Sequence, residues 1–372
     1  MQQVAQSWLV LEISKSPFLL GLDAFLSSIP IFLFSLVGGV IADRMDRRRL
    51  LILSQVVQLS CAFLLAFLIY MGVVQIWHIL TLSFVVGTAQ SFGGPAYQAL
   101  VPSLVEPEDL PNALALQSIQ FNVARVIGPV LGGLAFTKLG YVWCFSLNGI
   151  SYIAVIISLA LLTIRFVPKK AEVSMLTSMK QGIAFIRNQG AMEALIALAF
   201  LMTFLGIPVL TFLPVFAKDV FHGGPETFTT MLSISGAGAI TGALMVAAMG
   251  NISNKGKVAL TSLICLGLSI AGFAVSKVLI FSYAMLFVSG VALMAVFTLI
   301  ASLVQLITGN EMRGRVMSVY NVAFRGGMPI GSLVTGWLVP IFSAPAVLAV
   351  DGLLLFALGL YFLVIQKKVA EL

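Results

Sequence analysis

Two arginines interrupt long apolar stretches, each standing four residues before a proline: Arg125 before Pro129 and Arg325 before Pro329. At 1.5 Å per residue from a helix end, both would lie about 15–20 Å inside a bilayer, near its midplane. A cation there costs about 2.5–3.5 kcal/mol, so each arginine should face protein or water instead of lipid. Two roles are open for each arginine. It can bridge backbone carbonyls or a neighbouring helix end, or it can line a central cavity, where it meets an anionic or polar substrate group or a proton-binding acid. We predict the second role, substrate binding.

Few acidic residues fall inside the apolar stretches, so few groups are candidates for proton coupling. Asp23 lies 20 residues from Asp43, about 30 Å along a helix and therefore near the outer rim. Asp351 lies in the outer third of the last apolar stretch, and Glu12 and Glu193 are the other acids. None lies at the midplane, and each can serve as a plain interface residue. Asp23 and Asp351 are the candidates for binding a proton or a substrate cation.

The stretch Gln90–Gln98, QSFGGPAYQ, is polar and contains glycine and proline. Irregular backbone at membrane depth is tolerated only where it is buried in protein or lines a cavity. Gln90 and Tyr97 are therefore candidate substrate-binding residues in the wall of a translocation pathway. A plain helix kink is the alternative.

Other kinds of chemistry have no residues to support them. The sequence contains no G-x-x-x-x-G-K-[ST] phosphate loop and no G-x-S-x-G elbow after a strand. His78 and His222 are far apart, and Cys61, Cys144 and Cys265 lack C-x-x-C spacing. We predict that the protein is not an enzyme and binds no cofactor and no metal.

The composition is that of an integral membrane protein. Hydrophobic residues make up 60% of the 372-residue chain, charged residues make up 9%, and the mean hydropathy is +1.07. About a quarter of the residues in a soluble domain are charged. The net charge of +7 does not indicate nucleic-acid binding, because the basic residues are scattered between apolar runs.

The apolar runs predict an all-α polytopic bundle with two pseudo-symmetric six-helix halves, at 1–164 and 191–372, joined by a cytoplasmic linker at 165–190. The first apolar run, 4–13, is roughly half the ~20 residues that a span needs, so we expect the chain to begin inside helix 1. The Arg-x-x-x-Pro pattern recurs in equivalent helices of the two halves, as a parallel repeat would require. The other spans are expected at 18–42, 50–71, 76–105, 112–136, 142–164, 191–216, 228–249, 258–275, 279–307, 316–339 and 346–365.

The distribution of lysine and arginine tests this topology. Of the 21 lysines and arginines, Arg125 and Arg325 lie inside the membrane spans. The predicted spans place fifteen of the others on one membrane face and four on the opposite face: Lys15, Lys138, Lys218 and Lys277. Because loops rich in Lys and Arg stay in the cytoplasm, the first face is the inner one, and the C-terminus lies inside.

The densest charge cluster is the loop GGVIADRMDRRRL at 38–50. It resembles the signature loop between helices 2 and 3 of the major facilitator superfamily. Its Asp-Arg-x-Asp-Arg-Arg form resembles the branch of macrolide-efflux and enterobactin-exporter proteins, although the superfamily more often has glycine where this chain has Asp46. Asp43 could accept hydrogen bonds across the two halves and hold an inner gate shut; a solvated topology anchor is the alternative. The predicted gating residues here are Gly39, Asp43, Arg44, Arg47 and Arg48.

A second predicted gating segment is Gly128-Pro129-Val-Leu-Gly132-Gly133. Its glycines let a neighbouring backbone approach closely, and its proline removes a helical hydrogen bond and bends the helix. The segment resembles the helix-5 signature of antiporters, which is associated with export. Ordinary small-residue packing is the alternative.

Together these features predict a secondary active exporter of a small amphipathic compound, a drug or a secreted metabolite such as a siderophore. The resemblance implies alternating access, proton antiport and a monomer in the bacterial inner membrane, with the small molecule, protons and the lipid bilayer as partners. The alternatives are import of a nutrient or lysophospholipid, and a non-transporting membrane sensor or defective fragment.

Overall fold

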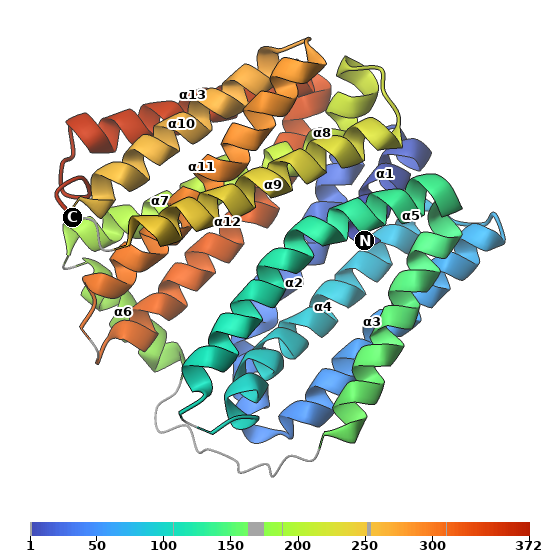
Figure 1. Ribbon diagram of the computed structural model, residues 1–372, viewed down its shortest axis with the longest axis horizontal. Helices are drawn as coiled ribbons and strands as arrows, with labels where there is room; N and C mark the ends of the chain where they lie inside the picture. Colours follow the sequence, from blue (N-terminus) through green and yellow to red (C-terminus); the bar gives the residue numbers. More distant parts are fainter. Residues whose placement is uncertain (1, 107, 163–174, 188, 251–253, 310) are drawn as a thin grey trace. The chain divides into compact units, whose positions relative to one another are not determined.

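The computed structural model describes residues 2–106, 108–162, 175–187, 189–250, 254–309 and 311–372. Within these ranges, the side chains at 35–36, 39–40, 42–44, 118, 121–122, 125–126 and 175–179 lie outside the description. Every regular element of the described chain is a helix (Figure 1), which confirms the predicted fold class. The chain divides into two compact units, each described by itself below.

The first unit comprises residues 1–15 and 22–175. Within it α3 packs against both α4 and α5, and α1 packs against α5. Its helices are α1 (Gln2–Ser14), α2 (Pro17–Arg44) from Leu22 onward, α3 (Arg47–Tyr70), α4 (Ile76–Leu100), η1 (Val101–Ser103) and α5 (Leu110–Leu161).

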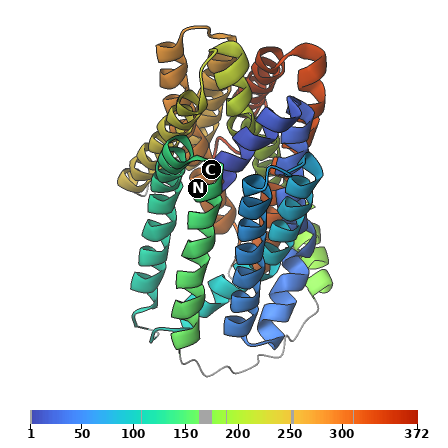
Figure 2. The same cartoon turned by 90° about the vertical axis from the view of Figure 1, so that its right-hand side faces the viewer.

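Helix α5 consists of two arms that meet at Gly140. The backbone there has φ +81° and ψ 179°, a conformation that glycine adopts without steric cost. The teal and green arms, drawn in Figures 1 and 2, correspond to the two spans expected at 112–136 and 142–164.

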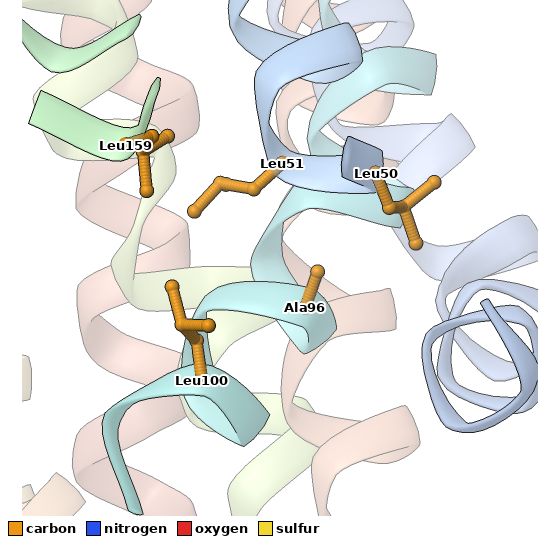
Figure 3. Close-up of a cluster of buried hydrophobic side chains, with 5 residues drawn as sticks. All are labelled: Leu50, Leu51, Ala96, Leu100 and Leu159. Atoms are coloured by element: carbon orange, nitrogen blue, oxygen red, sulfur yellow. The ribbon is translucent and has the colours of Figure 1, made fainter. Parts of the chain in front are cut away.

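One end of the first unit is held by a cluster of buried apolar side chains from α3, α4 and α5 (Figure 3). Leu51 and Leu100 are buried side chains of this cluster, and Leu159 comes from the last turn of α5. The cluster fixes the three helix ends against one another. Its members are Leu50, Leu51, Ala96, Leu100 and Leu159.

The second unit comprises residues 16–21 and 176–372. Here α10 packs against α13 and α11, α11 against α9, and α12 against α7. The elements are α6 (Met175–Arg187), α7 (Gly190–Gly206), α8 (Pro208–Val215), η2 (Phe216–Val220), α9 (Pro225–Met249), α10 (Lys255–Val275), α11 (Leu279–Leu306), α12 (Arg313–Phe342) and α13 (Ala344–Val364).

The span expected at 191–216 is divided into α7, α8 and a π-helical turn, η2. Pro208 begins α8 and Pro214 lies inside it. Neither proline has an N–H group for the helical ladder, so the helix is interrupted at this place. The helix α6 falls in the segment that was expected to be the linker.

Eight stretches of the described chain are long and apolar enough to cross a membrane. They fall in α2, α3, α5, α7 to η2, α9, α10, α11 and α13. Neither α4 nor α12 is among them, although both have 25 residues or more. These two helices carry the candidate residues Gln90, Tyr97 and Arg325.

Candidate functional site

A buried polar cluster surrounds Asp23 in the first unit. The amide nitrogen of Gln6 donates to both carboxylate oxygens of Asp23, each at 3.0 Å, and to the Ser83 hydroxyl at 2.7 Å. Ser83 donates to Asp23 at 2.5 Å. The three residues come from α2, α1 and α4, and each is at most 8% exposed. No described lysine or arginine pairs with this carboxylate, whose contacts are therefore all to neutral donors.

The cluster continues along α1 toward the second arm of α5. Gln2 donates to Gln6 at 3.5 Å, and Asn148 donates to Gln2 at 2.7 Å. Gln2 and Gln6 are one helical turn apart, so they lie on one face of α1. Amide and hydroxyl groups thus connect Asn148 to the carboxylate of Asp23.

A second group of amides lies where α3, α4 and α5 meet. Gln90 and Tyr152 each donate to the side-chain oxygen of Gln58 at 3.3 Å. Gln58 in turn donates to the hydroxyl of Ser54 at 3.2 Å. Gln90 is exposed on α4, whereas Gln58 is 5% exposed, so the buried amide holds the exposed one in place.

Tyr97 also lies on an exposed face of α4, and its hydroxyl donates to the side-chain oxygen of Gln120 on α5 at 3.3 Å. Gln90 and Tyr97 are seven residues apart on a helix, which places them on the same face. This face offers neutral hydrogen-bonding groups and an aromatic ring.

In the second unit, Arg325 lies on an exposed stripe of α12. It stands 12 residues after Arg313, the first residue of α12, and so about 18 Å along the helix. Asn321 is exposed and Ser318 half-buried on the same face, whereas Val316 and Tyr320 are buried against neighbouring helices. No described residue accepts a hydrogen bond from the Arg325 guanidinium.

Asp351 lies on α13 in the second unit and is 9% exposed. The side chain of Thr335 on α12 is its hydrogen-bond partner. Its Oδ2 atom is buried and accepts no hydrogen bond in the described part of the chain. Asp351 therefore has fewer partners than Asp23.

Arg47 and Arg48 lie at the start of α3 and bind the ends of two other helices. Arg47 donates to the carbonyl of Ala99 at 3.0 Å, and Arg48 donates to the carbonyls of Leu159, at 2.6 Å, and Ala160. These carbonyls belong to the last turns of α4 and α5, whose final carbonyls have no partner within their own helices. Both arginines thus tie helix ends together within the first unit; a gating role for them stays a prediction.

The segment from Gly128 to Gly133 lies in the first arm of α5. Gly132 and Gly133 are buried, and Gly128 and Pro129 are half-buried. The thiol of Cys144, in the second arm, contacts the Gly132 carbonyl at 3.9 Å. At Gly128 no atom lies within 4 Å of an added Cβ atom, so close packing does not require glycine there. A gating role for the segment stays a prediction. The surroundings of Gly39 and the side chains of Asp43, Arg44 and Arg125 lie outside the described residues.

The sequence did not identify the residues that form hydrogen bonds with the predicted site residues Asp23, Gln90 and Tyr97, or that extend these hydrogen-bonded groups. The glutamines at positions 2 and 6 share one face of a short apolar helix, and this spacing was the available signal. Nothing in the sequence connects them to a serine or an asparagine far along the chain. The missed residues are Gln2, Gln6, Gln58, Ser83, Gln120, Asn148 and Tyr152.

Comparison with known proteins defines the class. The family described as transmembrane secretion effector matches residues 1–371. Two solved transporters share the fold. Peptide transporter POT has a TM-score of 0.77 and 13% identity, and the match covers 99% of this chain and 91% of that one. Nucleoside transporter NupG has a TM-score of 0.78 and 15% identity, and the match covers 97% of this chain and 94% of that one. The chain belongs to the transmembrane secretion effector family of the major facilitator superfamily.

Curated relatives of similar length support this assignment. Macrolide efflux protein A of Streptococcus pyogenes is 24% identical over 90% of this chain and 84% of its own length. The staphyloferrin A transporter of Staphylococcus aureus is 24% identical over 98% and 92%, and the enterobactin exporter EntS of Shigella boydii is 25% identical over 95% and 84%. The protein is thus an integral membrane transporter of small molecules and not an enzyme, as its sequence predicts.

Proposed function

We propose that the protein is a secondary active exporter that moves a small amphipathic compound out of a bacterial cell by alternating access. The direction is supported by the relatives, whose names include a macrolide efflux protein and an enterobactin exporter. The segment from Gly128 to Gly133 of α5 contains Pro129, which removes one helical hydrogen bond and supports a bending point in the first unit.

The observation that carries the proposal is the exposed Arg325. A guanidinium about 18 Å along a membrane helix is not stable against hydrocarbon, so an exposed one borders water. A water-accessible stripe at that depth is the wall of a translocation pathway. Arg325 and Asn321 then offer a cation and an amide to the passing molecule.

The chemistry of these groups indicates the kind of substrate. In the second unit, Arg325 would bind a carboxylate or another anionic group. In the first unit, the exposed Gln90 and Tyr97 offer neutral hydrogen-bonding groups and an aromatic ring. The two candidate acids, Asp23 and Asp351, are buried, so they are poorly placed to pair with a cationic substrate. We therefore infer that a substrate with an anionic group is preferred over a purely cationic one.

Export against a gradient needs an energy source, and we propose protons. Asp23 is the group that would carry the proton, because its carboxylate is buried among neutral donors from α1 and α4. Its protonation would change the hydrogen bonds that join α1, α2 and α4, which couples the charge to helix packing. We further propose that the carrier works as a monomer in the bacterial inner membrane with its C-terminus in the cytoplasm.

Accumulation assays in an efflux-deficient bacterium test this function. Cells producing the protein should retain less of a labelled carboxylate siderophore than cells with an empty vector. Arg325→Ala should slow export by at least about tenfold, because a charge-assisted hydrogen bond contributes roughly 1.5–3 kcal/mol. Arg313→Ala, on the exposed first residue of the same helix, is the matched control and should export normally.

Three results would contradict the proposal. Equal retention in cells with and without the protein, for siderophore, macrolide and dye alike, would exclude export of these compounds. Equal loss in Arg325→Ala and Arg313→Ala cells would exclude a specific role for the charge at depth. Uptake instead of release in oriented vesicles would reverse the proposed direction.

A further inference from the structure

An open groove of about 340 Å³ runs between α3 and α4 in the first unit. This volume is in the range of roughly 300–1,000 Å³ that small-molecule sites occupy. From Leu50 to Val57 the groove follows eight residues of α3, about 10 Å of helix. Leu53 and Phe84 on its rim are 60% and 39% exposed, so the groove opens on the outside of the unit. Its lining consists of Leu50, Leu53, Ser54, Val57, Phe84, Val85, Thr88, Ala89 and Phe92.

The groove presents no free polar group to an occupant. Its two hydroxyl side chains both donate to backbone carbonyls: Ser54 to Ala89 at 2.7 Å and Thr88 to Phe84 at 2.8 Å. The remaining lining is aliphatic or aromatic. The part of an occupant that enters the groove is therefore a hydrocarbon, since a polar molecule would lose hydrogen bonds to water there.

A cation lies at one end of the groove. Arg49 stands four residues before Leu53, so both lie on the same face of α3. The Arg49 side chain is 86% exposed, and its described partner is Asp46 at 3.5 Å, an exposed pair of little strength. Arg47 and Arg48, in contrast, bind the carbonyl ends of α4 and α5. The N-terminus of α3 is capped by the Asp46 carboxylate, which accepts from the Arg48 N–H at 3.0 Å.

We propose that this groove is a binding site for an anionic phospholipid. One acyl chain lies between α3 and α4, and the phosphate binds Arg49 at the end of the membrane span. The membrane-capable stretch of α3 begins at Arg47, which places Arg49 at headgroup level. Leu50 belongs both to the groove and to the buried cluster at the ends of α3, α4 and α5, so the lipid would stabilise that junction.

Native mass spectrometry of the purified full chain tests the site with phosphatidylglycerol and phosphatidylcholine of identical acyl chains. The wild type should retain phosphatidylglycerol more tightly. Arg49→Gln should weaken phosphatidylglycerol binding about fivefold, as expected for one surface cation near an anionic lipid. It should weaken phosphatidylcholine binding less, because the choline cation offsets the charge of the phosphate in that lipid. The matched control is Lys257→Gln, because Lys257 is also exposed and also the third residue of a membrane helix, α10.

A second pair of variants tests the acyl chain. Val85→Trp fills the groove and should remove the preferentially bound lipid, whereas Leu268→Trp, on an exposed face of α10, should not. Both replace partly exposed side chains, and the Arg49 pair provides a test that leaves the packing untouched. Equal retention of the two lipids, or equal effects within either pair, would overturn the proposal. The proposal would also be overturned if Val85→Trp retained lipid like the wild type but lost substrate binding or self-association, because the groove would then bind substrate or a second copy of the chain.

Discussion

The amide of Gln6 on α1 donates a hydrogen bond to each carboxylate oxygen of Asp23 on α2, both at 3.0 Å. The pair is buried, and Ser83 on α4 completes it. A short helix at the beginning of the chain is thereby joined to two long helices through one carboxylate. Hydrogen bonds to a buried carboxylate contribute more than neutral ones do, because the charge has no water to replace a lost donor.

Replacement of Gln6 should therefore destabilise the first unit. In Gln6→Leu the carboxylate loses two hydrogen bonds, and we expect the free energy of unfolding to fall by about 1–3 kcal/mol. Thermal unfolding in detergent measures this change. Gln3→Leu is the matched control, because Gln3 is exposed on the same helix, and it should unfold like the wild type. A Gln6→Leu protein as stable as Gln3→Leu would show that the cluster is not a stabilising contact.

Replacement of Asp23 by asparagine should separate coupling from binding. Asparagine keeps the size of the side chain and can still hydrogen-bond Ser83, but it cannot take up a proton. Substrate exchange across vesicles without a gradient should persist in Asp23→Asn, whereas export driven by an imposed pH gradient should be lost. Glu12→Gln is the control, because Glu12 is exposed and is bound by the Tyr141 hydroxyl. Gradient-driven export by Asp23→Asn would contradict the assignment of Asp23 as the proton carrier.

The hydrogen bonds of Arg48 to the end of α5 predict that this side chain stabilises the first unit. Arg48→Ala removes donors to Leu159 and Ala160, and we expect a loss of about 1–2 kcal/mol. Arg49→Ala removes one exposed pair with Asp46 and should cost at most about 0.5 kcal/mol in lipid-free detergent. The difference between the two unfolding midpoints is the measurement. Equal midpoints would mean that the carbonyl contacts of Arg48 add no stability.

Close packing of α9 on α11 predicts a strong effect of one methyl group. A Cβ atom at Gly238 would lie 2.1 Å from the carbonyl oxygen of Phe287, so Gly238→Ala should cost about 1–3 kcal/mol by overpacking. At Gly94 on α4 no atom lies within 4 Å of such a Cβ atom, and Gly94→Ala should be neutral or stabilising by up to about 1 kcal/mol. Thermal unfolding of the two variants side by side checks this contrast. Similar midpoints would argue against the close helix contact.

The helices follow from the sequence because a chain in hydrocarbon must satisfy its backbone hydrogen bonds within itself. Apolar runs of membrane length, separated by charged or glycine-containing turns, leave little choice of secondary structure. The spans expected at 258–275 and 279–307 agree closely with α10, Lys255–Val275, and α11, Leu279–Leu306. The break at Pro208 was not predicted, because proline is tolerated in membrane helices and its effect depends on the neighbouring helices.

Some of the candidate site residues could also be picked out from the sequence. A charge inside an apolar run is costly wherever it lies, so Arg325, Asp23 and Asp351 could be recognised from their positions alone. The residues that contact each of them could not be predicted from the sequence. Asp23 is 17 residues from Gln6 and 60 from Ser83, and Arg48 is 111 residues from Leu159. These partners depend on which helix packs against which, at what rotation.

The amino-acid sequence by itself determined the membrane class, the helices and the few polar residues whose presence in them requires an explanation. The tertiary structure alone decided that Asp23 is held by α1 and α4, that Arg48 closes the end of α5, and that α3 and α4 leave an apolar groove beside Arg49. The physical reason is that burial of apolar surface is non-directional and makes nearly every helix face acceptable. Close packing and short-range hydrogen bonds then select one arrangement, and both depend on residues far apart in the chain.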